Sequence, residues 1–415
     1  MPSLKKNIIY SSILTTANYL FPLLTYPYVS RVLGVANIGL CNFVDSLVNY
    51  FLILSMLGIN IVGIREIAKN KNNRHKLELT FSRLFTLNTM TTTFAVIVLI
   101  AAIHLVPKLY ENYALMWMGV LKLIFNYLLI EWLYKGLEDF KYITHRTIAV
   151  KFIYVACVFL FVKSSEDISI YYFLLTAMII VNAIINIIHA RKYIKIRLCF
   201  SELGAYAKAI GILGFYSMLT SMYTTFNVAY LGFVSSDVEV GYYTTGTKIH
   251  SIILMLFSAA TGVLMPRMSS LLAEGKHLEF KRLIKKSVKI LLIFSIPCIV
   301  VIELFAPLII SIIAGSGYEG AVLPLRIIAP LIFIIGIEQV LITQSLMPMG
   351  KDKAILINSI LGAIVGVTMN IILVPRLAST GSSIVWFASE VTVMLSALYF
   401  FRKAWKNIKG LSISQ

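Results

Sequence analysis

The feature that most constrains this chain is a succession of twelve apolar stretches along its length. A hydrocarbon core about 30 Å thick takes about 20 apolar residues per helix. The twelve stretches are 8–30, 40–64, 85–106, 114–134, 147–162, 170–189, 210–232, 242–266, 288–311, 323–347, 354–374 and 382–401. Inside a bilayer no water satisfies the backbone, so stretches of this length must be helical. The sequence therefore predicts an all-α polytopic membrane protein with about twelve transmembrane helices.

The composition agrees with that prediction. Hydrophobic residues make up 59% of the chain and charged residues 13%. An ordinary soluble domain is about 45–50% apolar and about 25% charged. This composition excludes a soluble protein.

The basic residues show which ends of the predicted helices face the cytoplasm. The chain has 37 Lys and Arg residues against 19 Asp and Glu residues, a net charge of +18. With the N-terminus inside, thirty of them fall on the inner side, and the four in outer loops are Arg31, Lys108, Lys163 and Arg376. Inner loops of membrane proteins are enriched in Lys and Arg, so both termini are predicted to be cytoplasmic. The positive charge needs no nucleic-acid partner.

Motifs for catalysis, nucleotide binding and metal binding are missing from the sequence. The four cysteines have no CxxC spacing, and the six histidines never form HxxxH or HExxH. No GxxxxGKS, GxxxxGKT, GxGxxG or GxSxG run occurs. The predicted outer loops are about ten residues or shorter, too short to build the site of a membrane enzyme. The sequence therefore predicts a protein that is not an enzyme and has no resident metal or cofactor.

Matched residues at a constant offset divide the chain into two repeats. Three pairs lie 202 residues apart at corresponding points of the predicted helices: Gly39 and Gly241, Arg65 and Arg267, Arg83 and Lys285. Because six is an even number, two six-helix repeats enter the membrane from the same side, as parallel repeats do. We predict two pseudo-symmetric lobes, residues 1–200 with the first six helices and residues 201–415 with the last six.

Four basic residues lie where a membrane protein rarely places them. Lys122, Lys248 and Arg326 fall inside predicted helices, and Arg31 lies at the outer end of the first. Ionisable groups inside the membrane are costly and are functional candidates. Lys122 lies about 12 Å deep at 1.5 Å per residue, and it either pairs with a carboxylate in the bundle or contacts a ligand. Arg326 and Lys248 lie nearer the outer surface, which their long side chains can also reach.

Five acidic residues also fall inside the predicted helices. Asp45 lies at nearly the same depth in the first repeat as Lys248 in the second, so the two form a charge pair or both face the cargo. Glu131 is nine residues from Lys122, on the opposite face of the helix, so these two are not partners. The other three, expected to cap helix ends or form structural pairs, are Glu303, Glu338 and Glu390. Five acids against four bases do not predict a net cationic cavity.

Two prolines mark candidate hinges in the first helix. Pro22 and Pro27 both fall inside the stretch 8–30. A proline removes one backbone hydrogen bond and bends a helix, which a membrane tolerates only where protein or water satisfies the freed carbonyl. Pro22 and Pro27 are therefore predicted to interrupt the first helix, either as hinges or as bends that shape packing.

Six sequence runs carry a resemblance to a known family. Those of the first half are PLLTYPYVSRVLGVANIG at 22–39, GIREIAKNKNN at 63–73 and EWLYKGLEDFKYITHR at 131–146. Those of the second half are VGYYTTGTKI at 240–249, LMPRMSSLLAEGK at 264–276 and LMPMGKDKA at 346–354. Over nearly the whole chain they resemble the polysaccharide-synthesis flippases of the Wzx type, members of the multidrug, oligosaccharidyl-lipid and polysaccharide exporter superfamily. The resemblance implies two six-helix lobes around a central cavity, as in MATE transporters.

The resemblance also implies a function. Such a protein moves an undecaprenyl-diphosphate-linked oligosaccharide, an O-antigen or capsule repeat unit, across the bacterial cytoplasmic membrane by alternating access. In related flippases basic cavity residues hold the diphosphate or acidic sugars, and the candidates here are Arg31, Lys122, Lys248 and Arg326. Asp45 and Glu131 are candidates for coupling or charge pairing. No cofactor is implied, although H⁺ or Na⁺ antiport would add to the drive. The implied protein partners are a polysaccharide polymerase and a chain-length regulator.

Two other functions are weighed against this one. A multidrug cation antiporter of the same superfamily would have a cavity dominated by acids and aromatic residues, and the five acids inside helices fit it. A polytopic polysaccharide polymerase or ligase would carry a large outer loop with a cluster of Arg, His and Glu, which this sequence lacks. A drug-efflux assay separates the first alternative from the flippase.

Overall fold

The structure is a computed structural model that describes residues 4–411 and contains only helices and connecting turns in that range. Side chains are described throughout it except at 4, 5, 8, 19, 216, 217, 220, 222–224, 256–263, 265, 266 and 407–411. The chain divides into two compact units, Met1–Ser221 and Met222–Gln415. The two lobes predicted from the repeat stay a prediction.

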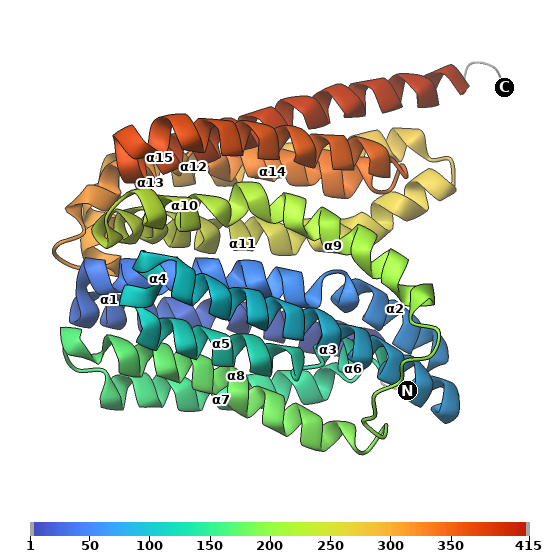
Figure 1. The fold of residues 1–415 in the computed structure, drawn as a ribbon. Coiled ribbons are helices and arrows are strands. Elements are labelled where there is room, and N and C mark those ends of the chain that lie inside the picture. Colours follow the sequence, from blue (N-terminus) through green and yellow to red (C-terminus); the bar gives the residue numbers. More distant parts are fainter. Residues whose placement is uncertain (1–3, 412–415) are drawn as a thin grey trace. The chain divides into compact units, whose positions relative to one another are not determined.

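Unit 1 is built from long helices connected by short turns (Figure 1). Its elements are α1 Leu4–Met56, α2 Ile59–Asn70, α3 Arg74–Leu105, α4 Pro107–Glu111, α5 Tyr113–Tyr127, α6 Glu131–Gly136, α7 Phe140–Phe161, the short 3₁₀ helix η1 Ser165–Asp167, α8 Ile168–Ala190 and most of α9 Gly204–Thr224. Within it, α1 packs against α3, α5 and α7, and α5 packs against α8. Helices far apart in the sequence are thereby placed side by side.

Unit 2 is also built from long helices connected by short turns. Its elements are α10 Phe226–Val234, α11 Asp237–Ala273, α12 His277–Ile313, η2 Glu319–Ala321, α13 Val322–Ile328, α14 Leu331–Leu341, the π-helical turn η3 Ile342–Leu346 and α15 Asp352–Leu411. Within it, α15 packs against α10, α13 and α14, while α11 packs against α12, α13 and α14.

Two of the longest helices run across two predicted spans each: α15 contains both of its spans, whereas α1 ends at Met56 and its second span, 40–64, continues into α2. The backbone leaves the helical region at Gly34 (φ 77°) inside α1 and at Ala378 (φ 46°) inside α15. Glycine adopts such a positive φ without steric cost, and both residues lie in predicted outer loops. The described residues contain eight helices that are long and apolar enough to cross a membrane. Two of these eight, the helices divided at Gly34 and at Ala378, correspond to two predicted spans each. Together with the helices at 204–234 and 237–273, the elements follow the twelve predicted spans. This confirms the all-α polytopic fold.

Several predicted boundaries differ from the structure. The fifth span, predicted at 147–162, is helix α7, which begins at Phe140. Its start is fixed by Asp139, whose side chain accepts a hydrogen bond from the Tyr142 backbone N–H at 3.4 Å. The tenth span, predicted as one helix, is divided into α13, α14 and η3, with Pro330 at the first division.

The prediction that Pro22 and Pro27 interrupt the first helix is wrong. The only non-helical backbone inside α1 is at Gly34. A proline removes a single backbone donor, and the backbone on both sides of each proline stays helical. The helix therefore continues through both prolines, and a hinge at either of them stays a prediction.

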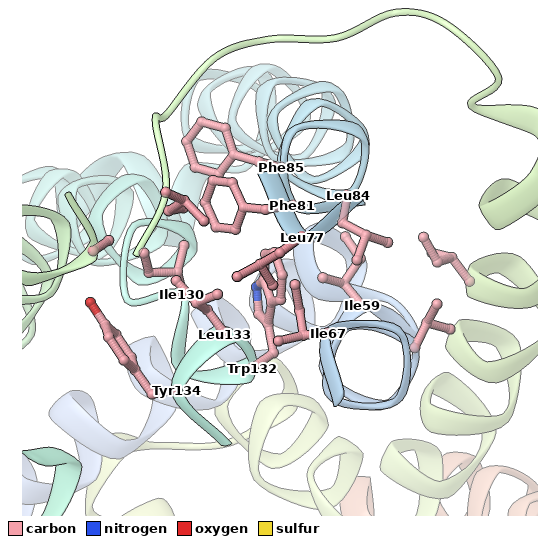
Figure 2. Close-up of a cluster of buried hydrophobic side chains, with 14 of the residues drawn as sticks. Ile59, Ile67, Leu77, Phe81, Leu84, Phe85, Ile130, Trp132, Leu133 and Tyr134 are labelled. Atoms are coloured by element: carbon pink, nitrogen blue, oxygen red, sulfur yellow. The ribbon is translucent and has the colours of Figure 1, made fainter. Parts of the chain in front are cut away.

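A cluster of buried hydrophobic side chains joins α2, α3 and α6 (Figure 2). The Trp132 ring stacks on Phe81 with 5.2 Å between centroids. A Cβ atom at Gly63 would lie 2.7 Å from the Trp132 ring, so α2 meets α6 through a residue without a side chain. Both α2 and α6 follow a residue with φ 40°, Leu57 and Ile130 respectively. The cluster thus packs the two short helices against each other and against α3.

Candidate functional site

The in-span lysine of unit 1 forms an ion pair with the in-span aspartate. Lys122 on α5 and Asp45 on α1 place Nζ and Oδ1 2.6 Å apart. Residues one turn away on each helix explain the approach, because a Cβ atom at Gly119 would lie 2.5 Å from Cγ2 of Val48. Glycine at this position lets α5 come close enough to α1 for the two charges to meet.

A tyrosine completes this cluster from a third helix. The Tyr172 hydroxyl on α8 donates to the same Asp45 oxygen at 2.9 Å. The Lys122 side chain is 11% exposed and that of Asp45 is 33% exposed. The carboxylate is therefore the more accessible of the two charged groups. Tyr172 carries no sequence signal, since it is one of 22 tyrosines and lies in an apolar helix.

Glu131 belongs to a separate ion-pair network. It is the first residue of α6 and lies 2.9 Å from Arg146 Nη2 and 3.1 Å from Lys135 Nζ. Glu131 and Lys122 are not partners, as predicted, but the reason differs, because they lie on two helices, α6 and α5, and not on opposite faces of one. This arrangement gives Glu131 a charge-pairing role at the junction of α6 and α7.

Two buried basic residues on α7 were missed by the sequence analysis. Arg146 directly precedes the predicted stretch 147–162 and Lys151 lies just inside it, and both were counted with the cytoplasmic segment, but both side chains are buried. The Lys151 ammonium donates to Asn18 Oδ1 at 2.8 Å and to the Ala17 carbonyl at 3.4 Å. Among the described residues no carboxylate lies within ion-pair distance of Lys151 Nζ. A buried cation with neutral partners is a second candidate for contact with an anion.

Arg31 lies at the outer end of the first predicted span. Its side chain is exposed, and Nη1 donates to the Pro27 carbonyl at 2.6 Å. The neighbouring residues of the same sequence run tie this middle part of α1 to the turn after α7. The Tyr28 hydroxyl donates to the Val162 carbonyl at 2.7 Å, and the Asn37 amide donates to the Ser165 carbonyl at 2.7 Å.

The other two predicted basic residues belong to unit 2. Lys248 is half-buried on α11. Arg326 on α13 lies 3.9 Å from Glu303 on α12, with both side chains more than 40% exposed. Arg326 also lines a cleft of about 490 Å³ together with Glu239, Glu319 and Arg376. The structure thus joins Lys122 with Asp45 in one unit and Arg326 with Glu303 in the other.

Two family models match the chain. One, described as polysaccharide biosynthesis protein, matches residues 4–272, and the other, described as MatE, matches residues 213–372. A protein of Escherichia coli (strain K12) named "Putative O-antigen transporter" is 28% identical over 404 residues, which cover 96% of this chain and 97% of that protein. A protein of the same name from Shigella dysenteriae is 26% identical over 404 residues, covering 95% and 99% respectively.

Solved structures share the fold at low sequence identity. An inward-facing multidrug resistance MATE transporter of the MOP superfamily superposes with a TM-score of 0.73 at 14% identity, covering 95% of this chain and 96% of that one. The lipid II flippase MurJ in an inward closed conformation gives the same TM-score and identity, covering 97% and 90%. The expected MATE-like architecture is confirmed. With a family model matched over more than half of its length, this polytopic membrane protein belongs to the polysaccharide biosynthesis protein family.

Proposed function

We propose that the chain is a flippase, not an enzyme, that moves lipid-linked oligosaccharides across the bacterial cytoplasmic membrane. Its family and the names of two relatives matched over nearly their full length support this proposal. So does the fold shared with a flippase for another lipid-linked glycan. The cargo we propose is an undecaprenyl-diphosphate-linked O-antigen or capsule repeat unit.

The observation that carries the proposal is the cluster of Asp45, Lys122 and Tyr172 on three spanning helices. A bare charge moved into hydrocarbon costs many kcal/mol, so a diphosphate needs a polar path with cations along it. The Asp45 side chain is one third exposed and that of Lys122 is 11% exposed, so the ion pair must open before the ammonium meets the diphosphate. In the proposed cycle the diphosphate competes with the Asp45 carboxylate for the Lys122 ammonium while the isoprenoid tail stays in lipid.

The membrane potential supplies part of the drive in this scheme. An anion leaving an inside-negative cell gains about 2.3 kcal/mol per charge per 100 mV. The two lobes would alternate access to the two membrane faces, with H⁺ or Na⁺ antiport as an addition. Association with a polysaccharide polymerase and a chain-length regulator is part of the same proposal.

Export in a strain that lacks its own flippase tests the two basic candidates of unit 1. We expect Lys122→Ala and Arg31→Ala to abolish surface polysaccharide while the protein inserts into the membrane at wild-type levels. Lys163→Ala is the matched control, because Lys163 is exposed and its Nζ also donates to the carbonyl four residues earlier. Full surface polysaccharide in both Lys122→Ala and Arg31→Ala cells would contradict the assignment.

A second candidate function is export of cationic drugs. Two observations favour it, the fold shared with multidrug MATE transporters and the buried acids Glu338 and Glu390 of unit 2. Cells that overproduce the chain in a drug-sensitised strain separate the two functions. The flippase proposal predicts unchanged drug sensitivity, whereas raised resistance that depends on the acids would favour the antiporter.

A further inference from the structure

One end of unit 2 carries a surface of exposed basic side chains. Helix α12 has 37 residues and is about 55 Å long at 1.5 Å per residue, whereas the hydrocarbon core is about 30 Å thick. Its apolar part is predicted to begin at residue 288, so its first turns lie outside the hydrocarbon, on the side predicted to be cytoplasmic. The exposed bases of these turns and of the end of α15 form what we call the inner basic surface: Lys281, Arg282, Lys285, Lys286, Lys289, Arg402, Lys403 and Lys406.

An aromatic contact joins the two parts of this surface. The Trp405 ring on α15 stacks on the Phe280 ring on α12 with 5.9 Å between centroids, and Phe280 is fully buried. Each of the two rings is next in sequence to a base of the surface, since Lys281 follows Phe280 and Lys406 follows Trp405. The inner basic surface is therefore one patch on two packed helices.

The bases of this surface have no counter-charge from the chain. Among the described residues no carboxylate lies within ion-pair distance of any of the eight. The two acids that directly precede them in the sequence have other partners. Glu274 Oε2 lies 2.7 Å from Lys276 Nζ, and Glu279 Oε2 lies 3.9 Å from Arg267 Nη2.

The spacing of the bases makes them repel one another. Like charges four residues apart destabilise a helix, and four pairs of the surface have this spacing: 281 and 285, 285 and 289, 282 and 286, 402 and 406. On α2 of unit 1, by contrast, Arg65 and Lys69 lie 2.8 and 3.0 Å from the same Glu66 oxygen. A basic helix end can thus include a carboxylate. The inner basic surface has none, so an anion from outside the chain is needed to relieve its repulsion.

The face of α12 that carries the bases becomes the lipid-exposed face further along the helix. Ile293, Ile296 and Val300 are apolar and 64%, 52% and 48% exposed. At about 100° per residue, Lys285, Lys289 and Ile296 lie within about 40° of one another around the helix axis. The bases therefore lie on the lipid-facing side of α12, at the level where lipid tails end and headgroups begin. Lipid headgroups are the anions that this position brings to them.

We propose that the inner basic surface binds the phosphate headgroups of anionic phospholipids in the cytoplasmic leaflet. Ammonium and guanidinium groups form strong charge-assisted hydrogen bonds with phosphate oxygens. The negative surface of that leaflet also attracts clusters of basic residues next to spanning helices. Bound headgroups supply the counter-charge that the chain lacks and hold the ends of α12 and α15 at the membrane surface. This inference does not depend on the proposed function, because it concerns the lipid around the protein and not the cargo.

Binding of fluorescent phosphatidylglycerol to the purified full-length protein in a neutral detergent tests the proposal. We expect phosphatidylglycerol to bind more tightly than fluorescent phosphatidylcholine, with a preference that falls as salt is added. Each basic residue near an anionic surface contributes about fivefold in affinity. The Lys281→Gln, Lys285→Gln, Lys289→Gln variant should therefore bind phosphatidylglycerol about a hundredfold more weakly than the wild type.

A control variant removes the same charge from other parts of the predicted cytoplasmic side. It carries Lys141→Gln, Lys195→Gln and Lys208→Gln, three exposed lysines of unit 1 that are far apart in the sequence, and it should keep the wild-type preference. Equal affinity of the wild type for the two lipids would overturn the proposal. So would wild-type binding by the α12 variant, or an equal loss of binding in the control variant.

Two soluble probes identify the source of the anion. Inorganic phosphate and polyglutamate should displace phosphatidylglycerol only at much higher concentration than the lipid. Displacement by phosphate at an equal concentration would indicate a site for soluble phosphate, and displacement by polyglutamate would indicate an acidic protein partner. Either result would overturn the assignment to lipid. If the triple variant of α12 does not fold, Lys285→Gln alone should weaken binding about fivefold, and unchanged affinity would contradict the proposal.

Discussion

Single residues show that buried basic groups in unit 1 have different surroundings. Lys122 faces a carboxylate at 2.6 Å, whereas Lys151 has an amide and a backbone carbonyl as its partners. Breaking a buried ion pair leaves an uncompensated charge and is destabilising. Removing a buried cation that has only neutral partners also removes the cost of burying it. The two lysines should therefore respond differently to substitution.

Replacement of Lys151 separates a role in transport from a role in stability. We expect Lys151→Met to unfold in detergent at the wild-type temperature or above it, because a desolvated charge is lost. Export should fall about tenfold or more, the effect of losing one hydrogen bond to a charged group. Lys141→Met, on the exposed first turn of the same helix, is the control and should change neither quantity. Full export by Lys151→Met would rule out a transport role for this residue.

The residues that could be predicted from the sequence are those whose type is unusual for the stretch that contains them. Lys122 and Asp45 stand out because charges are rare in apolar stretches, but their pairing joins residues 77 apart and depends on which helices pack together. Tyr172 lies 127 residues from Asp45 and looks like any tyrosine of an apolar helix. Lys151 lies just inside the predicted stretch 147–162, but it was counted with the basic residues that precede that stretch.

Elements are predicted well where hydropathy sets them and poorly where packing bends them. The twelve apolar spans appear in the right order because each must satisfy its own backbone in the membrane. The divisions after Leu57 and after Ile130 both fall inside predicted spans, 40–64 and 114–134, so the apolar pattern does not place them. What fixes them is contact with other segments, such as the Gly58 N–H donating to the Ile210 carbonyl at 3.2 Å.

A glycine at the first of these divisions should be sensitive to one methyl group. A Cβ atom at Gly58 would lie 2.7 Å from the Ile210 carbonyl oxygen and 2.7 Å from Leu213 Cβ. We expect Gly58→Ala to cost about 1–3 kcal/mol of stability through overpacking, seen as a lower unfolding temperature in detergent. Gly211→Ala on α9, where nothing lies within 4 Å, should be neutral or stabilising by up to about 1 kcal/mol. Equal effects of the two substitutions would contradict this packing.

At the scale of the whole molecule, the distribution of basic residues predicts how the chain lies in the membrane. Reporter fusions check this directly. A fluorescent protein fused after Gln415 should fluoresce, because it folds in the cytoplasm, and alkaline phosphatase fused after Lys163 should be active outside. Lys192 lies in the basic segment between α8 and α9. An active phosphatase fused after Lys192 would contradict the predicted orientation.

The central claim is that this chain by itself moves a lipid-linked oligosaccharide across a bilayer. The most direct measurement places the purified protein in liposomes that contain undecaprenyl-diphosphate-linked oligosaccharide and follows the glycan reaching an impermeant glycosidase on the far side. We predict transfer by the wild type and by Lys163→Ala, and transfer by Lys122→Ala no faster than in liposomes without protein. Wild-type transfer no faster than in protein-free liposomes, under an imposed membrane potential, would contradict the claim. Equal transfer by the wild type and by Lys122→Ala would contradict the assignment of Lys122 to the transport site.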